Sequence, residues 1–348
     1  MKDSSRYDVV IIGGGAAGLS AAVALGRSLR STAVIDSGSP RNAPAAGVHN
    51  FLSRDGVPPL ELVASGRAEA ASYGSVLIDA EAVRVEKDPD GFTVTLQDGG
   101  RLSGRRLLVT TGLADELPDV EGLTAHWGAG VIHCPYCHGY EARGQAIGVL
   151  ATGPMAMHQV QMFRQLSSDV TLFLHTAAAP TAEEEELLAA LSVRVVSGKV
   201  GAVEETEGSL SGVRLESGDS FPLDALVVAP RFAARSALLE SLGVKISEHP
   251  MGIGYSAEVD PQGRTSVPGV WAAGNVADPV AQVMASSAAG LGAGAAINWD
   301  LIAEDAAAAV ERRRAGAGPA LGGAPAGHDN GTTTGTPDGT AELESHAH

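Results

Sequence analysis

Two cysteines, Cys134 and Cys137, are the only thiols of this 348-residue chain, and a histidine lies on the outer side of each, His133 and His138. Two such sulfurs, separated only by Pro-Tyr, can alternate between a dithiol and a disulfide. Because the chain has no further cysteine, the pair does not belong to a larger disulfide framework. The sequence therefore predicts redox chemistry at these two sulfurs.

The flanking histidines can activate these thiols. A thiol with a pKa of about 8.5 is only weakly ionised at pH 7, and a neighbouring imidazolium or a helix N-terminus lowers that pKa to about 3.5–7.5. Imidazoles also carry protons in the neutral range. We therefore predict four catalytic residues: Cys134, Cys137, His138 as the base and His133 as its substitute. A purely structural role stays open for either histidine. Three further histidines are predicted to be hydrogen-bonded or surface residues: His126, His158 and His175.

A zinc site is the rival interpretation of the same run, because thiols and imidazoles are zinc ligands. Adjacent residues in so tight a run converge poorly on one tetrahedral centre, and no second Cys/His pair stands at zinc-finger spacing. We therefore predict no metal site.

A glycine-rich turn near the N-terminus predicts a bound dinucleotide. Gly13, Gly15 and Gly18 follow the apolar run 8–12 and precede an Ala/Leu-rich stretch, and Asp36 lies about 20 residues further on. Glycines let backbone N–H groups approach a pyrophosphate at the start of a helix, and the acid can accept hydrogen bonds from ribose hydroxyls.

A second, degraded copy of this turn follows the cysteines. In the segment 151–156 the first glycine is replaced by Ala151, and Pro154 removes one N–H donor. The next strand leads into His175, without an arginine for a 2′-phosphate. A Rossmann-like scaffold without a nicotinamide nucleotide is therefore the favoured prediction.

Strand and helix patterns recur in the same order in the two halves, which predicts an α/β fold with two Rossmann-like (three-layer ββα) nucleotide-binding domains. The predicted strands are 8–12, 32–35, 82–86, 92–96, 106–110, 145–150, 170–174 and 225–229, with a meander of 193–196, 200–205 and 212–216. Three predicted helices cover 60–73, 157–166 and 281–297, and two more end near Leu29 and Leu191. Thr181 and Glu184 are predicted to form a capping box.

Composition excludes several classes of function. The net charge of −17 disfavours binding to nucleic acid and to anionic membranes, and no stretch reaches the roughly 20 apolar residues of a transmembrane helix. The short polar N-terminus does not resemble a secretory signal, so we expect a cytoplasmic protein. The Gly/Ala/Thr/Pro-rich end, 313–348, is predicted to be a disordered tail.

Four motifs resemble those of the low-molecular-weight thioredoxin reductase superfamily in order and spacing, over about residues 6 to 300. They are Gly13–Gly18, Thr110-Thr111-Gly112, Cys134–Cys137, and Gly269–Asn275 with Gln282.

Within that superfamily, the run Cys-Pro-Tyr-Cys-His-Gly-Tyr-Glu (134–141) resembles the gliotoxin- and holomycin-type dithiol oxidases, which are FAD enzymes that close disulfides in small natural products. The segment 36–42 and His49 resemble the same branch. His138 and Asn275 replace aspartates of the reductases, which weakens the transfer of reductase function.

The resemblance implies bound FAD, with Cys137 facing the flavin and Cys134 meeting the substrate. It also implies a split FAD domain, 1–114 with 243–312, around a degenerate NAD(P)H-like domain, 115–242, that carries the cysteines. The residues expected to hold the cofactor are Gly13, Gly15, Ala16, Ala17, Gly18, Asp36, Ser37, Arg41, Asn42, His49, Val83, Thr111, Gly112, Gly274, Asn275, Gln282 and Val283.

The function implied by the resemblance is oxidation of a small-molecule dithiol to an intramolecular disulfide by a homodimer, with O₂ as acceptor and H₂O₂ as product. The main alternative is a thioredoxin reductase-like disulfide reductase that uses NADPH or another donor. A metal-binding or non-catalytic interaction protein is the third class, and it predicts no flavin.

Overall fold

The structure, a computed structural model, describes residues 6–153 and 155–316. Its largest sheet has the strand order β3-β2-β1-β6-β5-β4, with β19 paired to β6. Strands β1, β2, β3, β6 and β19 run parallel, whereas β4 and β5 form the predicted antiparallel hairpin. The strand bounds are β1 (Arg6–Ile12), β2 (Thr32–Asp36), β3 (Val76–Asp79), β4 (Ala82–Asp88), β5 (Gly91–Leu96), β6 (Arg101–Val109) and β19 (Val270–Ala272).

The parallel strands are apolar on both faces because both faces are covered. Along β1, Val9 and Ile11 pack into the core that holds α1, whereas Val10 and Ile12 pack into the core on the opposite face. The helices of this half are α1 (Ala16–Arg27), α2 (Pro59–Ser72), α6 (Ala237–Ser241) and α7 (Val283–Arg314).

Helix α7 crosses α1 closely, and glycine makes the approach possible. A Cβ added at Gly290 would clash with the Ala17 carbonyl oxygen. The prediction of a helix over 281–297 was too short, because α7 reaches Arg314. The predicted tail begins inside this helix, and from residue 317 onward it lies outside the described residues.

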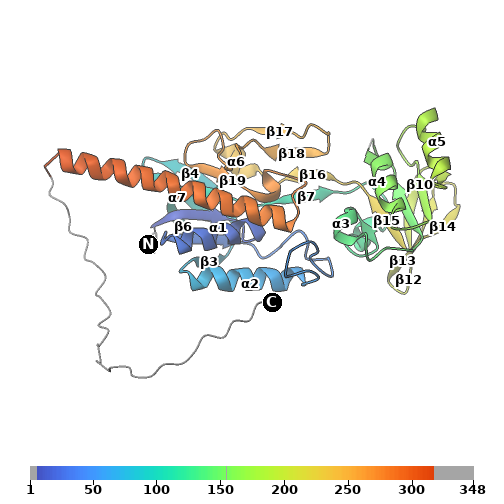
Figure 1. Cartoon of the computed structure of the whole chain (residues 1–348), viewed down its shortest axis with the longest axis horizontal. Helices are drawn as coiled ribbons and strands as arrows, with labels where there is room; N and C mark the ends of the chain where they lie inside the picture. The colour runs from blue at the N-terminus through green and yellow to red at the C-terminus, as the bar shows by residue number, and fades with distance from the viewer. Residues whose placement is uncertain (1–5, 154, 317–348) are drawn as a thin grey trace, which may run out of the picture. The chain divides into compact units, whose positions relative to one another are not determined.

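A second sheet of five parallel strands has the order β11-β10-β9-β15-β8, and helices α4 and α5 lie beside it (Figure 1). Strand β11 pairs in parallel with β10, so the prediction that 193–196 belongs to an antiparallel meander was wrong. The capping box at Thr181 and Glu184 is confirmed. The bounds are β8 (Val131–Ile132), α3 (Pro135–His138), β9 (Ile147–Leu150), α4 (Met155–Arg164), β10 (Val170–Phe173), α5 (Ala182–Ala190), β11 (Arg194–Val196) and β15 (Ala225–Val228).

Two small sheets complete the described part of the chain. One contains β12 (Val200–Thr206), β13 (Ser209–Leu215) and β14 (Ser220–Pro222), and the other has the order β17-β18-β16-β7. The second sheet joins strands from both sides of the predicted boundaries at 114 and 243, so that division into domains stays a prediction. Its strands are β7 (Leu113–Glu116), β16 (Arg231–Ala234), β17 (Ile246–Glu248) and β18 (Gly254–Ala257). By their contacts, residues up to Ile302 form one compact unit.

Candidate active site

The glycine turn after β1 has the geometry of a phosphate-binding turn. Gly13 has a φ of 109°, and a Cβ at Gly18 would clash with the Gly13 carbonyl oxygen. Thr110 reinforces the turn, since its hydroxyl donates to the Gly13 carbonyl at 2.7 Å. Gly15 caps α1 and has no neighbour within 4 Å of an added Cβ, so the first N–H groups of α1 border open space.

Asp36 ends the neighbouring strand and is fixed by backbone donors. One carboxylate oxygen accepts from the Gly14 N–H at 2.5 Å, and the other accepts from the Gly38 N–H at 2.7 Å. Each oxygen has a second lone pair, so the group can still accept from a ligand. Asp36 lines the same cavity as the glycine turn.

One cavity of about 1990 Å³ connects this turn to the cysteines. Typical ligand pockets measure about 300–1,000 Å³, so the cavity exceeds the need of one small ligand. The four predicted catalytic residues all line it: His133, Cys134, Cys137 and His138. Most predicted cofactor residues also line it: Gly13, Gly15, Ala16, Ala17, Asp36, Ser37, Arg41, Asn42, His49, Thr111, Gly112, Gly274, Asn275, Gln282 and Val283.

Two predicted cofactor residues lie elsewhere. Gly18 does not line the cavity but packs beneath the turn, against Gly13. Val83 borders a separate hollow beside Leu238 and Leu242. Ala82 reaches the cavity and Val83 does not, and the pairing of β4 with β5 shifts register between Ala82 and Arg84, at Val83.

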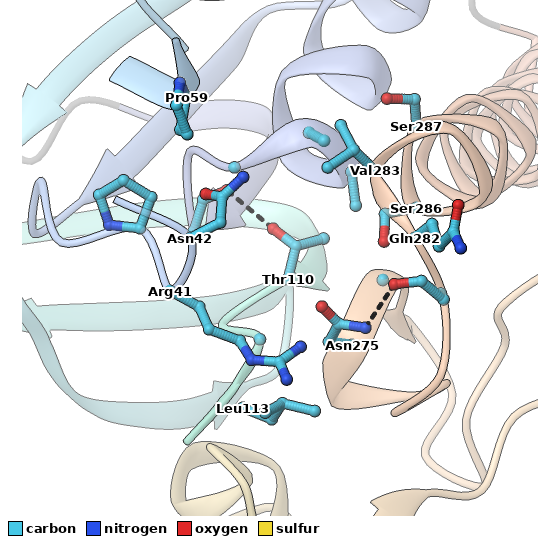
Figure 2. A pocket seen from close by; sticks show the side chains of 18 of the residues that line it. Arg41, Asn42, Pro59, Thr110, Leu113, Asn275, Gln282, Val283, Ser286 and Ser287 are labelled. Atoms are coloured by element: carbon cyan, nitrogen blue, oxygen red, sulfur yellow. Dashed lines mark hydrogen bonds between the residues drawn. The ribbon is translucent and has the colours of Figure 1, made fainter. Parts of the chain in front are cut away.

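Arg41 lies at the cavity wall (Figure 2), where an ion pair holds it. Its guanidinium donates to both carboxylate oxygens of Asp115, at 2.7 and 2.6 Å, and lies 5.2 Å from the ring centre of Phe232. The bidentate geometry fixes the loop after β2 to strand β7. On another side of the pocket in Figure 2 lies the start of α7, with Val283 and Ser286.

The two cysteines form a disulfide at the start of α3, with their Cα atoms 5.2 Å apart. Cys134 is the N-cap residue, and its carbonyl accepts from the N–H groups of Cys137 and His138 at 3.2 and 3.1 Å. Gln282 was predicted to lie near the cofactor. In the structure its amide nitrogen also lies 3.9 Å from the Cys134 sulfur, as a weak donor.

The loop after β2 also holds the cysteine helix. Asn50, with a φ of 60°, donates from its side-chain amide to the Tyr136 carbonyl at 2.6 Å. His49 has its Nε2 3.7 Å from a Glu141 carboxylate oxygen and its Nδ1 3.3 Å from Asp55. The predicted cofactor residue His49 thus lies close to the segment that follows the disulfide.

His133 is oriented by a backbone carbonyl. Its Nδ1 lies 2.9 Å from the Val228 carbonyl oxygen, which can only accept, so the proton sits on Nδ1 and Nε2 carries the lone pair. The ring meets Phe232 edge-on at 5.5 Å. Burial lowers the pKa of His133, and the Val228 carbonyl opposes this only partly.

His138 is a candidate general base whose ring nitrogens are not engaged by other groups among the described residues. Both of its ring nitrogens are buried, and neither has a hydrogen-bond partner among the described residues. Burial lowers its pKa below the ordinary value of 6.5, Glu141 opposes the shift, and His49 and His133 lower the pKa further. A neutral imidazole therefore lines the cavity with the two cysteines, and its two nitrogens are buried and unpartnered among the described residues.

One wall of the cavity was not predicted from the sequence. Met155, His158 and Met162 of α4 line it, and His158 is exposed, which agrees with its prediction as a surface or hydrogen-bonded residue. The other two histidines are hydrogen-bonded as predicted: His126 to Glu205 and His175 to the Val200 N–H. The spacing of the three α4 residues, one helix face, was the available signal.

Two features, a metal site and a membrane-spanning helix, are not found among the described residues. Within 6–153 and 155–316, no three His, Cys, Asp or Glu side chains are arranged to hold a metal ion. None of the helices in that part of the chain combines the length and the apolar character that a bilayer crossing requires.

Comparison with known proteins agrees with this geometry. The chain is 31% identical to "Thioredoxin reductase sirT" of Leptosphaeria maculans, over 87% of this chain and 97% of the relative. It is 34% identical to "Thioredoxin reductase tcpT" of Claviceps purpurea (strain 20.1), over 79% and 88%. The crystal structure of HlmI superposes with a TM-score of 0.83 at 42% identity, over 90% of this chain and 98% of HlmI.

These relatives confirm the resemblance to thioredoxin reductase-like enzymes and the fold with Rossmann-type sheets that it implies. A family model described as "Pyridine nucleotide-disulphide oxidoreductase" matches residues 7–290. The match covers the glycine turn, the disulfide and the start of α7. The chain therefore belongs to the pyridine nucleotide-disulphide oxidoreductase family, and it is an oxidoreductase.

Proposed function

We propose that this protein binds FAD and oxidises a small-molecule dithiol to its intramolecular disulfide, with O₂ as the acceptor and H₂O₂ as the product. One observation carries the proposal: a disulfide and an unpartnered buried imidazole border the same cavity as a dinucleotide-type glycine turn. The 42% identity to HlmI over nearly the whole of that protein supports it.

The residues of the first half fit an FAD molecule. Gly15 and the first N–H groups of α1 would hold the pyrophosphate, and Asp36 would accept from the ribose hydroxyls. Asn275 and Gln282 would border the ribityl chain and the ring, as the resemblance implies. When bound, FAD supplies a two-electron acceptor for the reduced cysteine pair and a site at which O₂ takes up those electrons.

The side chains of this chain carry out the thiol chemistry. A substrate thiolate attacks the Cys134 sulfur, which forms a mixed disulfide and releases Cys137 as a thiolate. The second substrate thiol gives its proton to His138 and attacks the substrate sulfur of the mixed disulfide, which releases the cyclic product and Cys134. The substrate, which entered as one thiolate and one thiol, has lost two electrons and one proton, and the enzyme pair is reduced.

Features of the second half favour O₂ over NADPH. Ala151 and Pro154 replace the residues that a nucleotide turn needs, and His175 offers its ring nitrogen to the Val200 N–H instead of to a ligand. The competing function is a disulfide reductase that draws electrons from NADPH and delivers them to thioredoxin. The names of the relatives, which are called thioredoxin reductases, favour this reductase function.

An anaerobic spectral experiment separates the two functions. The purified protein, yellow with FAD, is mixed without oxygen with either dithiothreitol or NADPH. We expect prompt bleaching by the dithiol, none by NADPH, and recovery of the colour with formation of H₂O₂ when air is admitted. Prompt bleaching by NADPH would establish the reductase, and a colourless protein without flavin would overturn both functions.

The proposal includes the assembly and location that were expected from the sequence, a homodimer in the cytoplasm. Light scattering of the purified protein tests the dimer directly.

A further inference from the structure

The cavity extends beyond the disulfide along one face of α4. Met155, His158 and Met162 occupy positions i, i+3 and i+7 and therefore share a helix face, and all three line the cavity. The α4 residues that point the other way belong to the core beneath the helix: Ala156, Val160 and Phe163.

The helix that carries this face contacts the helix of the cysteines, α3. A Cβ added at Gly139 would meet the Leu166 side chain just beyond the end of α4. The wall formed by Met155, His158 and Met162, the α4 wall, is thus continuous with Cys134 in one cavity.

The size of the cavity leaves room for a second ligand. About 1990 Å³ is roughly twice the upper end of the range for a single small-molecule site, about 1,000 Å³. The glycine turn and Asp36 border one part of this space, and the α4 wall borders another part beside the cysteines.

We propose that the α4 wall is the subsite for the dithiol substrate and selects a flat, uncharged, ring-bearing dithiol. The inference rests on the proposed dithiol oxidation. Methionine thioethers are polarisable, adapt to shape and contact flat rings favourably. His158 adds a single hydrogen-bonding group, and none of the three residues carries a fixed charge. Such a wall orients a heterocyclic dithiol with a carbonyl acceptor and gives nothing to a short flexible one.

The test compares two dithiols on the same enzyme disulfide. The flat probe is N-methyl-4,5-dimercapto-1,8-naphthalimide, whose carbonyl oxygens can accept a hydrogen bond and whose two thiols lose two electrons and two protons to give a cyclic disulfide while the enzyme disulfide takes them up. The flexible probe is dithiothreitol. The holoprotein is mixed anaerobically with each probe, quenched with N-ethylmaleimide, and the alkylation of Cys134 and Cys137 is followed by mass spectrometry.

We expect wild-type protein to react faster with the flat probe. His158→Ala and Met162→Ala should each slow that reaction about tenfold, the worth of one hydrogen bond or one buried thioether, and leave the dithiothreitol rate unchanged. His158→Gln should restore part of the loss, because its amide can still donate. Gln161→Ala is the matched control, since Gln161 is exposed on the same helix and does not line the cavity.

The outcomes separate the two proposals. If the wild type reacts with both probes but the variants lose nothing, or lose equally on both, the subsite is overturned and the dithiol chemistry stands. If the wild type shows no preference for the flat probe, the selectivity is overturned. If neither probe opens the disulfide, the proposed function itself fails.

Discussion

The two nucleotide-type turns of this chain follow one plan and differ in what they offer a ligand. Gly13 donates its N–H to the Ile35 carbonyl of the next strand at 2.8 Å, and Ala151 donates in the same way to the Phe173 carbonyl at 2.8 Å. These bonds align the two turns residue by residue. Asp36 follows Ile35, whereas Leu174 follows Phe173, so the second copy has an apolar side chain where the first has its carboxylate.

The difference shows how one scaffold can keep its core and change its ligand. The strands of the second sheet are as deeply buried as those of the first, so the packing that defines the fold is intact. Leu174 packs against the core of the second sheet. Only the groups that would face a nucleotide have changed, and the helix that follows the second turn borders the cysteine end of the cavity.

The largest effect is expected from the sulfurs, which belong to the second half. Cys134→Ser and Cys137→Ser should each reduce dithiol turnover to background, because neither variant can form the disulfide. Both should keep bound flavin, since the proposed cofactor residues are untouched. Visible absorbance measures the flavin, and oxygen consumption measures turnover. Full activity in either variant would contradict the catalytic roles assigned to the two sulfurs.

His138 gives the next largest effect, and it acts through pH. His138→Gln should slow substrate oxidation about a hundredfold, the usual worth of a general base. The base works in its neutral form, and its pKa is lowered, chiefly by burial. Wild-type activity should therefore hold as the pH falls through 6.5, the ordinary value, and decline only below it. The variant should lack this decline.

The control for that variant is His126→Gln. His126 is bonded to Glu205 and does not line the cavity, so its replacement should leave both the rate and the pH profile unchanged. A wild-type profile that falls already above pH 6.5 would contradict the lowered pKa.

A pair of glycine substitutions probes the two turns. Gly18→Ala places a Cβ against the Gly13 carbonyl and the Thr110 hydroxyl, whereas Gly153→Ala, at the second-turn position that aligns with Gly15, meets nothing within 4 Å. Overpacking costs about 1–3 kcal/mol, so the first variant should bind FAD about ten- to a hundredfold more weakly. The second should bind it like wild type. FAD titration of the apoprotein measures both, and equal affinities would remove the distinction between the turns.

The smallest effect concerns the loop that links the halves. Asn50→Ala removes the hydrogen bond to the Tyr136 carbonyl, worth about 1 kcal/mol, and should slow anaerobic flavin bleaching by dithiols about fivefold. Asn50→Asp should not rescue the rate, because an ionised carboxylate cannot donate. Leu52→Ala, at an exposed position of the same loop, is the control. An aspartate variant as fast as wild type would show that the bond is not needed.

Local patterns predicted the parts of the fold that depend on local rules. The glycine turn, the β4–β5 hairpin and the capping box at Thr181 each have a short-range signature, and each lies where it was expected. Strand β11 was misassigned because a strand of three residues, Arg194–Val196, does not reveal its partner. Strands β7, β16 and β18 were missed for the same reason, since short strands with distant partners have no signature of their own.

The chemistry of the site was predicted from the sequence, but the full set of residues that line it was not. The cysteines and their flanking histidines could be found because their residue types are rare and adjacent. Val83 does not line the cavity, and it lies where the pairing of β4 with β5 shifts register, between Ala82 and Arg84, which local sequence patterns do not reveal. The α4 wall has no motif, and only the path of α4 along the cavity gives Met155, His158 and Met162 a common role.

The bond between the Asn50 amide and the Tyr136 carbonyl adds a small cost to any outward movement of the cysteine segment. A sulfur pair that alternates between an internal acceptor and a bulky protein would break this bond in every cycle, at about 1 kcal/mol each time. The proposed small-molecule dithiol requires no such movement, because it can diffuse to the cysteines and leave while they stay in place.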